Sequence, residues 1–361
     1  MKKLWLMGVV VGVGLASSVL RTPSPKEKEK KERLQESNKV TSGLKVLSFG
    51  EDLGEVPSCP SPLERGWGEA TPLQEFLKLY NDYYLASAVD SMPWNGSVEK
   101  CNPGTLTQAI YDKAEKRINF FRLVNDLPKI TFNPEYHKQP QAAAMMMLAN
   151  NNLSHTPPKT WKCYSDDAAA GASKSCLSLN WSSYTKEKSI VTGFMNDIGE
   201  SNYFCGHRRW LLYSKATEVG YGATPKTEAI FVSYDYTKPT LTTPTFIAYP
   251  WDGFVPYTLI FSKWSFSLPE GLEVDFSKVT ISIKDNLGKQ MPFKLYPQKK
   301  GYLDPTITWQ MLNLFTKDEE DYSENNLDKK GFIGKEITVK VSNVLVNKKP
   351  KTYQYVVKII K

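Results

Sequence analysis

The chain has 361 residues, enough for two or three domains of ordinary size. Hydrophobic residues make up 41% and charged residues 23%, a globular composition that excludes a wholly disordered or collagen-like chain. The net charge of +8 is spread along the chain with no basic stripe interleaved with aromatic residues, so we expect no nucleic-acid partner.

The first 20 residues are typical of a signal peptide. Lys2 and Lys3 precede an uncharged apolar run at 4–20, and small residues near its end suit cleavage close to Ser18. A run of this length is at the short edge of what can span a bilayer, so an uncleaved N-terminal anchor is the alternative. We expect a secreted or cell-surface protein that touches a membrane only through this segment, if the segment is not removed.

Residues 21–100 are predicted to form a low-order linker with one amphipathic helix. A mixed-charge run at 26–33 has no apolar face, and several prolines near residue 60 oppose regular structure. Between about 72 and 88, apolar residues fall at helical spacing, which predicts a helix whose apolar face contacts the next domain.

Three further helices are predicted before residue 200. Apolar residues recur every three or four positions over 105–126, and Pro128 ends this helix. Asn133 and a following proline are typical of a second helix start, but Pro140 inside that helix predicts a kink or a late start. A third helix is expected at about 187–197.

Strands are predicted in the rest of the chain, and the pattern changes near residue 240. Two short strands are expected at 210–213 and 229–234. Beyond the boundary, apolar runs alternate with turn residues, as in the half-buried pattern of Val279, Ile281 and Ile283. The expected strands are 246–249, 257–267, 278–284, 291–296, 306–311, 336–346 and 351–360. Seven short strands in about 120 residues predict an antiparallel β-sandwich over 240–361.

Five cysteines allow at most two internal disulfides in an exported chain and leave one thiol over. Because Cys59 lies in the least structured region, we expect the pairs Cys101–Cys163 and Cys176–Cys205. No Cys-x-x-Cys pair is present, which argues against a cysteine metal cluster.

Four short segments stand out between residues 115 and 222. In chain order they are Glu115–Arg122 with Asp126-Leu127-Pro128, then Leu153–Thr156, Gly206–Tyr213 and Glu218–Gly222. Together they resemble the CAP superfamily (cysteine-rich secretory, antigen 5 and pathogenesis-related proteins, with an SCP-like domain) in its bacterial exported form. The resemblance implies a CAP-like α-β-α sandwich over 101–239. The whole chain is then an α+β protein in which this sandwich precedes the C-terminal antiparallel β-sandwich.

The resemblance also implies a cleft lined by two histidines and two acidic residues, which in some members holds zinc or another divalent cation. By position the histidines are His155 and His207, Asp197 is the later acid, and Arg208 lies beside them. At the place of the earlier acid this chain has alanine, in the segment 169–175. A catalytic zinc ion usually takes three protein ligands. The candidates for the third are Asp197, Asp166, Asp167 and Glu200.

Because one acid of that set is missing, we favour a non-catalytic binding protein and make no firm cofactor prediction, with zinc or another divalent cation as the candidate. Its cleft, made of His155, His207, Asp197 and Arg208, would engage a lipid, a small ligand or a surface macromolecule. The alternative is a zinc-dependent hydrolase with the metal on the two histidines and Asp197 as ligand or general base; zinc would lower the pKa of its bound water to about 7. His137 matches none of the four segments and is expected at the surface.

Overall fold

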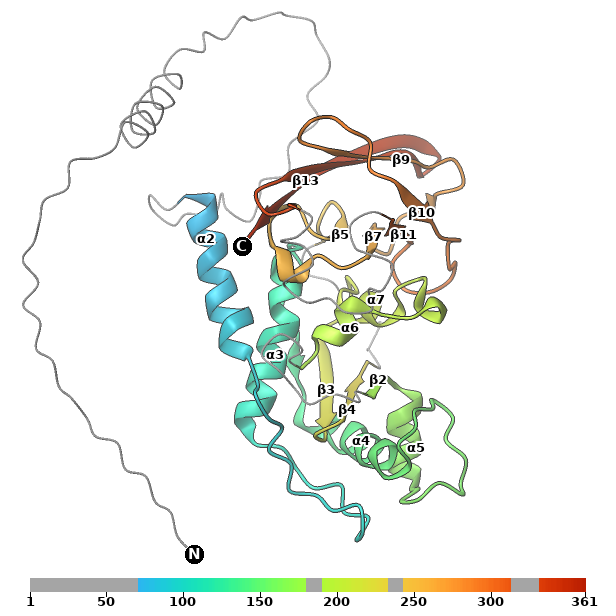
Figure 1. Ribbon diagram of the computed structural model, residues 1–361. Coiled ribbons are helices and arrows are strands. Elements are labelled where there is room, and N and C mark those ends of the chain that lie inside the picture. Colours follow the sequence, from blue (N-terminus) through green and yellow to red (C-terminus); the bar gives the residue numbers. More distant parts are fainter. Residues whose placement is uncertain (1–70, 180–189, 233–242, 313–330) are drawn as a thin grey trace, which may run out of the picture. The chain divides into compact units, whose positions relative to one another are not determined.

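The computed structural model describes residues 71–179, 190–232, 243–312 and 331–361 (Figure 1). The predicted signal segment 1–20, most of the predicted linker, Cys59 and the predicted boundary near residue 240 lie outside these residues. The described residues all belong to one compact unit of the chain. In this part of the chain, no helix combines the length and the apolar character that crossing a membrane requires.

Helix α2 (Pro72–Leu79) begins at a cap formed by Thr71. The Thr71 side chain accepts a hydrogen bond from the Gln74 backbone, and the Gln74 side chain accepts one from the Thr71 backbone. This reciprocal pair satisfies two N–H groups that the first helical turn leaves unpaired. A π-helical turn (Tyr80–Tyr84) and a 3-10 turn (Leu85–Ser87) continue the helical stretch.

Three helices and one turn follow before the first long strand. They are α3 (Gln108–Leu123), a 3-10 turn (Pro134–Tyr136), α4 (Lys138–Asn150) and α5 (Asp166–Ser173). Helix α4 has the late start that Pro140 predicts, because the 3-10 turn after Asn133 is separate from it. Pro140 falls in the first turn of α4, where a missing N–H removes no helical hydrogen bond.

The first sheet has four strands in the order β1-β3-β4-β2. They are β1 (Thr131–Phe132), β2 (Ser175–Leu179), β3 (Glu218–Ala223) and β4 (Thr227–Phe231). Helix α4 packs on β3 and β4, and two glycines of β3 allow the close approach of α4 and of the 3-10 turn before it. A Cβ atom on Gly220 would lie 2.0 Å from the Tyr136 carbonyl oxygen, and one on Gly222 would lie 2.2 Å from the Gln141 nitrogen.

In the described residues between β2 and β3 there are two short helices. They are α6 (Thr192–Asn196) and α7 (Gly206–Leu211), with a 3-10 turn (Glu200–Asn202) between them. The predicted strand at 210–213 is therefore wrong: an apolar run of four residues fits a buried helix turn as well as a strand. Of the helix predicted at 187–197, the described part is α6 alone.

Two antiparallel sheets form the C-terminal part, together with one parallel pair. The strands are β5 (Ile247–Tyr249), β6 (Gly253–Pro256), β7 (Lys263–Ser267), β8 (Val274–Asp275), β9 (Thr280–Asp285), β10 (Phe293–Leu295), β11 (Thr306–Met311), β12 (Glu336–Val346) and β13 (Lys349–Ile360). One sheet has the order β10-β11-β7-β5. In the other, of order β6-β13-β12-β8, β9 also pairs with β12, and β6 runs parallel to β13.

The mixed α and β composition and the antiparallel strands confirm the coarse fold class; packing of the sheets as sandwiches stays a prediction. The predicted ranges of β11 and β12 match to the residue. The predicted strand at 257–267 is only partly right, because a 3-10 turn (Tyr257–Leu259) precedes β7.

Helix α3 packs against the C-terminal part through aromatic rings. The Phe120 and Trp251 rings meet edge to face with centroids 5.6 Å apart, and Phe121 lies 6.3 Å from Tyr249. The Asn125 side chain also accepts a hydrogen bond from the Ala248 backbone N–H at 2.9 Å. One continuous buried cluster therefore includes residues from both sides of position 240.

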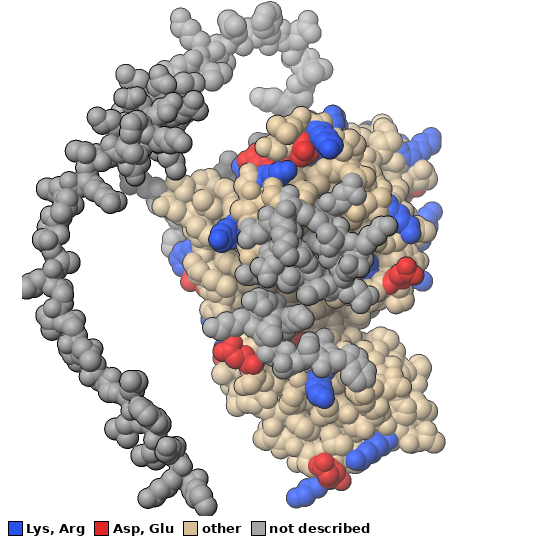
Figure 2. Space-filling view, in the orientation of Figure 1, with Lys and Arg blue, Asp and Glu red and all other residues tan. Residues whose placement is uncertain are grey.

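Charged side chains are scattered on the face seen in Figure 2. Among the described residues on that face, blue and red groups stand singly or in small clusters within a largely uncharged surface. This distribution agrees with the even spread of charge along the sequence.

Candidate functional site

The centre of the candidate site is a hydrogen-bonded pair, His207 and Asp197. Asp197 follows the last residue of α6 in a left-handed conformation (φ 59°), and His207 lies in the first turn of α7. The Asp197 Oδ1 and His207 Nδ1 atoms are 2.9 Å apart, and Asp197 Oδ2 accepts a hydrogen bond from the Arg208 backbone N–H at 3.2 Å. The Asp197 side chain is fully buried, whereas 24% of the His207 side chain is exposed. With its Nδ1–H donating to Asp197, the imidazole has only Nε2 left for an external group.

Lys263 in β7 holds the loop that carries Asp197. Its Nζ donates to the carbonyl oxygens of Asp197 at 2.7 Å, Gly199 at 2.5 Å and Asn202 at 3.4 Å. Burial lowers the pKa of Lys263. A strand of the C-terminal sheet thus positions the buried acid of the site, and sequence reasoning missed this residue because nothing local distinguishes it from other lysines.

Arg208 is buried, with 1% of its surface exposed. Its Nε donates to the Met195 carbonyl at 2.7 Å, Nη1 to the Lys263 carbonyl at 3.0 Å and Nη2 to the Asn196 carbonyl at 3.4 Å. The guanidinium also lies 4.2 Å from the centre of the Tyr249 ring. All three nitrogens are thus bonded internally, and the predicted role of Arg208 in ligand binding stays a prediction.

His155 lies in the exposed segment that follows α4. Its Nδ1 is 2.9 Å from the carbonyl oxygen of Ala172 in α5, so Nδ1–H is the donor. As in His207, Nε2 is the ring nitrogen that remains for an external group. Helices α5 and α6 both contact strand β2, and α7 contacts α6. No hydrogen bond or ring contact of the described residues joins His155 to His207, and their place in one cleft stays a prediction.

The described residues do not fit a three-ligand zinc site. Nowhere in the described ranges do three or more His, Cys, Asp or Glu side chains gather as a metal would need. Both oxygens of Asp197 accept hydrogen bonds from protein groups. Asp167 pairs with Lys138 at 2.8 Å, Asp166 lies in the same first turn of α5, and Glu200 is exposed. The chemistry considered for these residues therefore does not involve a metal, and zinc binding stays a prediction.

The cysteines bear out one predicted pair and not the other. Cys101 and Cys163 form a disulfide, as predicted. The predicted Cys176–Cys205 bridge is wrong, because both are free, buried thiols, one in β2 and the other directly before α7. Sequence order says nothing about whether two Cβ atoms come within the ~4.5 Å that a bridge requires. Burial raises the pKa of both thiols, which makes them poor nucleophiles.

A second buried polar group lies in the first sheet. Glu228 accepts hydrogen bonds from the Tyr221 hydroxyl at 2.6 Å and the Val191 backbone N–H at 3.2 Å, and burial raises its pKa. In helix α3, Arg117 is also buried, with no exposed surface, and it donates to the Ser87 hydroxyl at 2.6 Å. Sequence reasoning missed Glu228, although a single acid within an otherwise uncharged strand is a sign of a buried carboxyl.

His137 is half-buried rather than at the surface, so that prediction is wrong. Its ring stacks on Tyr111 with centroids 4.0 Å apart, and its Nδ1 accepts a hydrogen bond from the Tyr221 backbone N–H at 3.1 Å. Burial lowers the pKa of His137 to about 4. The residue ties the start of α4 to β3 and takes no part in the His207–Asp197 pair.

Comparison with known proteins gives a family match for the central part of the chain. Residues 116–236 match the family model described as CAP, cysteine-rich secretory protein family. Curated protein sequences yield no significant match. A 1.5 Å crystal structure of an extracellular protein containing an SCP domain, from Bacillus anthracis str. Ames, is 18% identical over 36% of this chain and 45% of that one, with a TM-score of 0.25. The present chain thus spans less than half of that protein. The family match includes His155, Asp197 and His207, and residues 116–236 are a domain of the CAP family of cysteine-rich secretory proteins.

Proposed function

We propose that this protein is an exported, non-catalytic binding protein whose CAP domain engages an amphiphilic ligand such as a lipid at His207. Export is supported by the basic and apolar start of the chain and by the secretory family that residues 116–236 match. The Cys101–Cys163 disulfide agrees with an oxidising compartment.

One observation carries the binding role: the His207 imidazole is held by a buried carboxylate and keeps part of its surface open. Its tautomer and orientation are set by Asp197, so Nε2 is presented in a defined direction. The Phe194 ring lies 5.5 Å from the imidazole, edge to face, and Trp210 is half-buried in the same short helix. Phe194 itself is buried, so the partly exposed aromatic side chain of this helix is Trp210. Together with the fixed nitrogen of His207, it suits a ligand with one polar group and an apolar body.

Catalysis has less support from the same geometry. An Asp–His pair of this form can serve as a general base when a nucleophile lies within hydrogen-bond reach of Nε2. Among the described residues no serine, threonine or cysteine side chain is hydrogen-bonded to His207. Asp197 is occupied at both oxygens and Arg208 at all three guanidinium nitrogens, so neither is placed to bind a reacting group.

The test uses the full chain and two probes, oleate and vesicles of phosphatidylglycerol, with binding measured by calorimetry and tryptophan fluorescence at pH 7.5. We expect saturable oleate binding that weakens about tenfold in His207→Asn, the effect of losing one hydrogen bond. His137→Asn is the matched control and should bind as the unaltered protein does. Oleate binding by the variant His155→Asn tests whether the second imidazole lines the same site.

The proposal is overturned if neither probe binds and the protein instead hydrolyses a nitrophenyl ester or a peptide in a manner that His207→Asn abolishes. Equal loss of oleate binding in His207→Asn and His137→Asn also contradicts it, because the effect would then follow from general destabilisation.

A further inference from the structure

The loop between helices α6 and α7 turns three of its carbonyl oxygens toward strand β7. Asp197 (φ 59°) and Gly199 (φ 98°) both have positive φ angles, which reverse the direction of the chain. The carbonyl oxygens of Asp197, Gly199 and Asn202 then lie 2.7, 2.5 and 3.4 Å from one atom, Nζ of Lys263. An ammonium group has three donors, so this loop can occupy all of them.

Lys263 is a buried cation that takes part in none of the ion pairs formed by the described residues. The residue is 6% exposed. Burial lowers its pKa, because taking the ammonium group out of water disfavours the charged form. An apolar residue would fill a buried strand position without this cost, so the three hydrogen bonds to the loop are what distinguishes lysine here.

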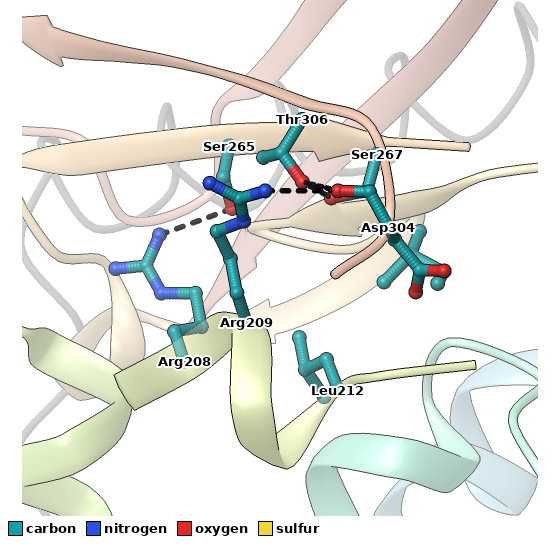
Figure 3. Close-up of a pocket in the computed structure, with 8 residues that line it drawn as sticks. Arg208, Arg209, Leu212, Ser265, Ser267, Asp304 and Thr306 are labelled. Atoms are coloured by element: carbon teal, nitrogen blue, oxygen red, sulfur yellow. Dashed lines mark hydrogen bonds between the residues drawn. The ribbon is translucent and has the colours of Figure 1, made fainter. Parts of the chain in front are cut away.

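The backbone of Lys263 binds helix α7 from the same strand. Its carbonyl oxygen accepts a hydrogen bond from Arg208 Nη1 at 3.0 Å, and the same nitrogen reaches the Ser265 hydroxyl at 3.2 Å (the latter bond is drawn in Figure 3). The Arg208 backbone N–H in turn donates to Asp197 Oδ2 at 3.2 Å. Asp197, Lys263 and Arg208 therefore form a closed ring of hydrogen bonds that joins the loop, β7 and α7.

This ring includes both groups that set the direction of the His207 imidazole. One is the Asp197 carboxylate, whose Oδ1 is 2.9 Å from His207 Nδ1. The other is α7 itself, since Arg208 is the next residue of that helix. The cavity between α7 and the strands β5, β7 and β11 has a volume of about 10 Å³, room for one water molecule, so the helix packs closely on the sheet. Loss of the Lys263 side chain should therefore release the carboxylate while α7 stays in place.

We propose that Lys263 is a positioning residue for the site at His207: it acts through Asp197, and the C-terminal sheet thereby fixes the imidazole of the CAP domain. Its effect on ligand binding rests on the proposed function of that site. The CAP domain then presents an oriented imidazole only while β7 is packed against the loop that carries Asp197. Ligand affinity at His207 should depend on this packing, and a bound ligand should favour the packing to the same degree.

The experiment replaces Lys263 by methionine in the full chain and first follows the His207 ring at pH 7.5 without any ligand. Lys263→Met keeps most of the apolar volume and the backbone carbonyl that binds Arg208, and it removes the three bonds to the loop. In the unaltered protein, nitrogen-15 magnetic resonance should show Nδ1 protonated and its proton in slow exchange with water. In Lys263→Met we expect Nδ1 to be only partly protonated and its proton to exchange fast.

Oleate binding measured by calorimetry is the second readout. If the oriented form of the ring falls to about one fifth of the population, oleate affinity should fall about fivefold in Lys263→Met. Lys113→Met is the matched control, because Lys113 Nζ also donates to a backbone carbonyl, that of Ala88, at 2.8 Å. This control should leave the His207 signals and the oleate affinity unchanged. Lys263→Gln keeps an N–H donor at the same position and should give values between those of the unaltered protein and Lys263→Met.

The His207 signals decide between the outcomes. An unaltered Nδ1 proton in Lys263→Met overturns the proposal, and so does an equal change in Lys113→Met, which would reflect general loosening. If Lys263→Met does not fold, Lys263→Gln gives the same comparison, and unaltered signals in that variant overturn the proposal too. An altered ring in Lys263→Met, combined with no oleate binding by the unaltered protein, supports the positioning role and contradicts only the proposed lipid ligand.

Discussion

His137 should make the stability of the protein depend on pH in a predictable direction. In the folded state the ring is stacked on Tyr111 and its pKa is lowered to about 4, because charging the half-buried imidazole costs solvation energy. In the unfolded chain the pKa of histidine is about 6.5. Between these values the unfolded chain binds a proton that the folded protein does not, so the free energy of unfolding falls as the pH falls.

The size of this effect follows from the two pKa values. A folded pKa of about 4 against an unfolded value of about 6.5 corresponds to ~3 kcal/mol over the whole range. Partial exposure of the ring to water reduces this to about 1–2 kcal/mol. Most of the loss falls between pH 6.5 and pH 4, and little occurs above pH 7.

His137→Asn removes the titrating group and keeps an acceptor for the Tyr221 backbone N–H. We expect urea unfolding to show a free-energy difference between pH 7 and pH 5 that is about 1 kcal/mol smaller in His137→Asn than in the unaltered protein. Nuclear magnetic resonance titration of the His137 ring should give a pKa well below 6. An identical pH dependence in both proteins would refute the reasoning, as would a ring that titrates near 6.5.

Three further substitutions test a disulfide, a close backbone approach and a buried cation by urea unfolding at pH 7. Cys101→Ser opens a disulfide whose cysteines are 62 residues apart and should lower the free energy of unfolding by about 4 kcal/mol, as reduction of the unaltered protein also should. Gly222→Ala places a Cβ atom 2.2 Å from the Gln141 nitrogen and should cost about 2–4 kcal/mol. Arg117→Met removes a fully buried guanidinium together with its three hydrogen bonds and should cost about 3 kcal/mol.

The last two substitutions have matched controls in the same chain. Gly193→Ala should be nearly neutral, since a Cβ atom there has no neighbour within 4 Å. Lys116→Met changes an exposed residue beside Arg117 and should also cost little. The packing argument fails if Gly222→Ala or Arg117→Met is as stable as its control, and the chain-entropy argument fails if reduction leaves stability unchanged.

The strands that the sequence predicts best are those with alternating side chains and turn residues on both sides. Strand β12 alternates buried and exposed residues over most of its length, and a turn at Asn347 and Lys348 ends it, so its range is predicted to the residue. The segment 210–213 lacks both features. Its four apolar residues fit either element, and tertiary packing places the first two, Trp210 and Leu211, in α7.

The candidate site is less predictable because its supporting contacts join residues far apart in the chain. Resemblance to the CAP family predicted that His207 and Asp197 line one cleft, and the structure shows them hydrogen-bonded. The lysine that supports Asp197, Lys263, is 66 residues away, and Asp304 lies 95 residues from Arg209. Hydrophobic spacing reports which side of an element faces the core but not which distant element it meets there.

The parallel pairing of β6 with β13 has a consequence for how the protein is made. Asp252, just before β6, accepts a hydrogen bond from the backbone N–H of Val356, which is 104 residues later in the chain. A ribosome that adds ~5–20 residues per second needs several seconds to reach the partner strand. During that interval the β6 edge lies open to strands of other nascent chains, so a holding chaperone during synthesis or translocation should raise the yield of native protein.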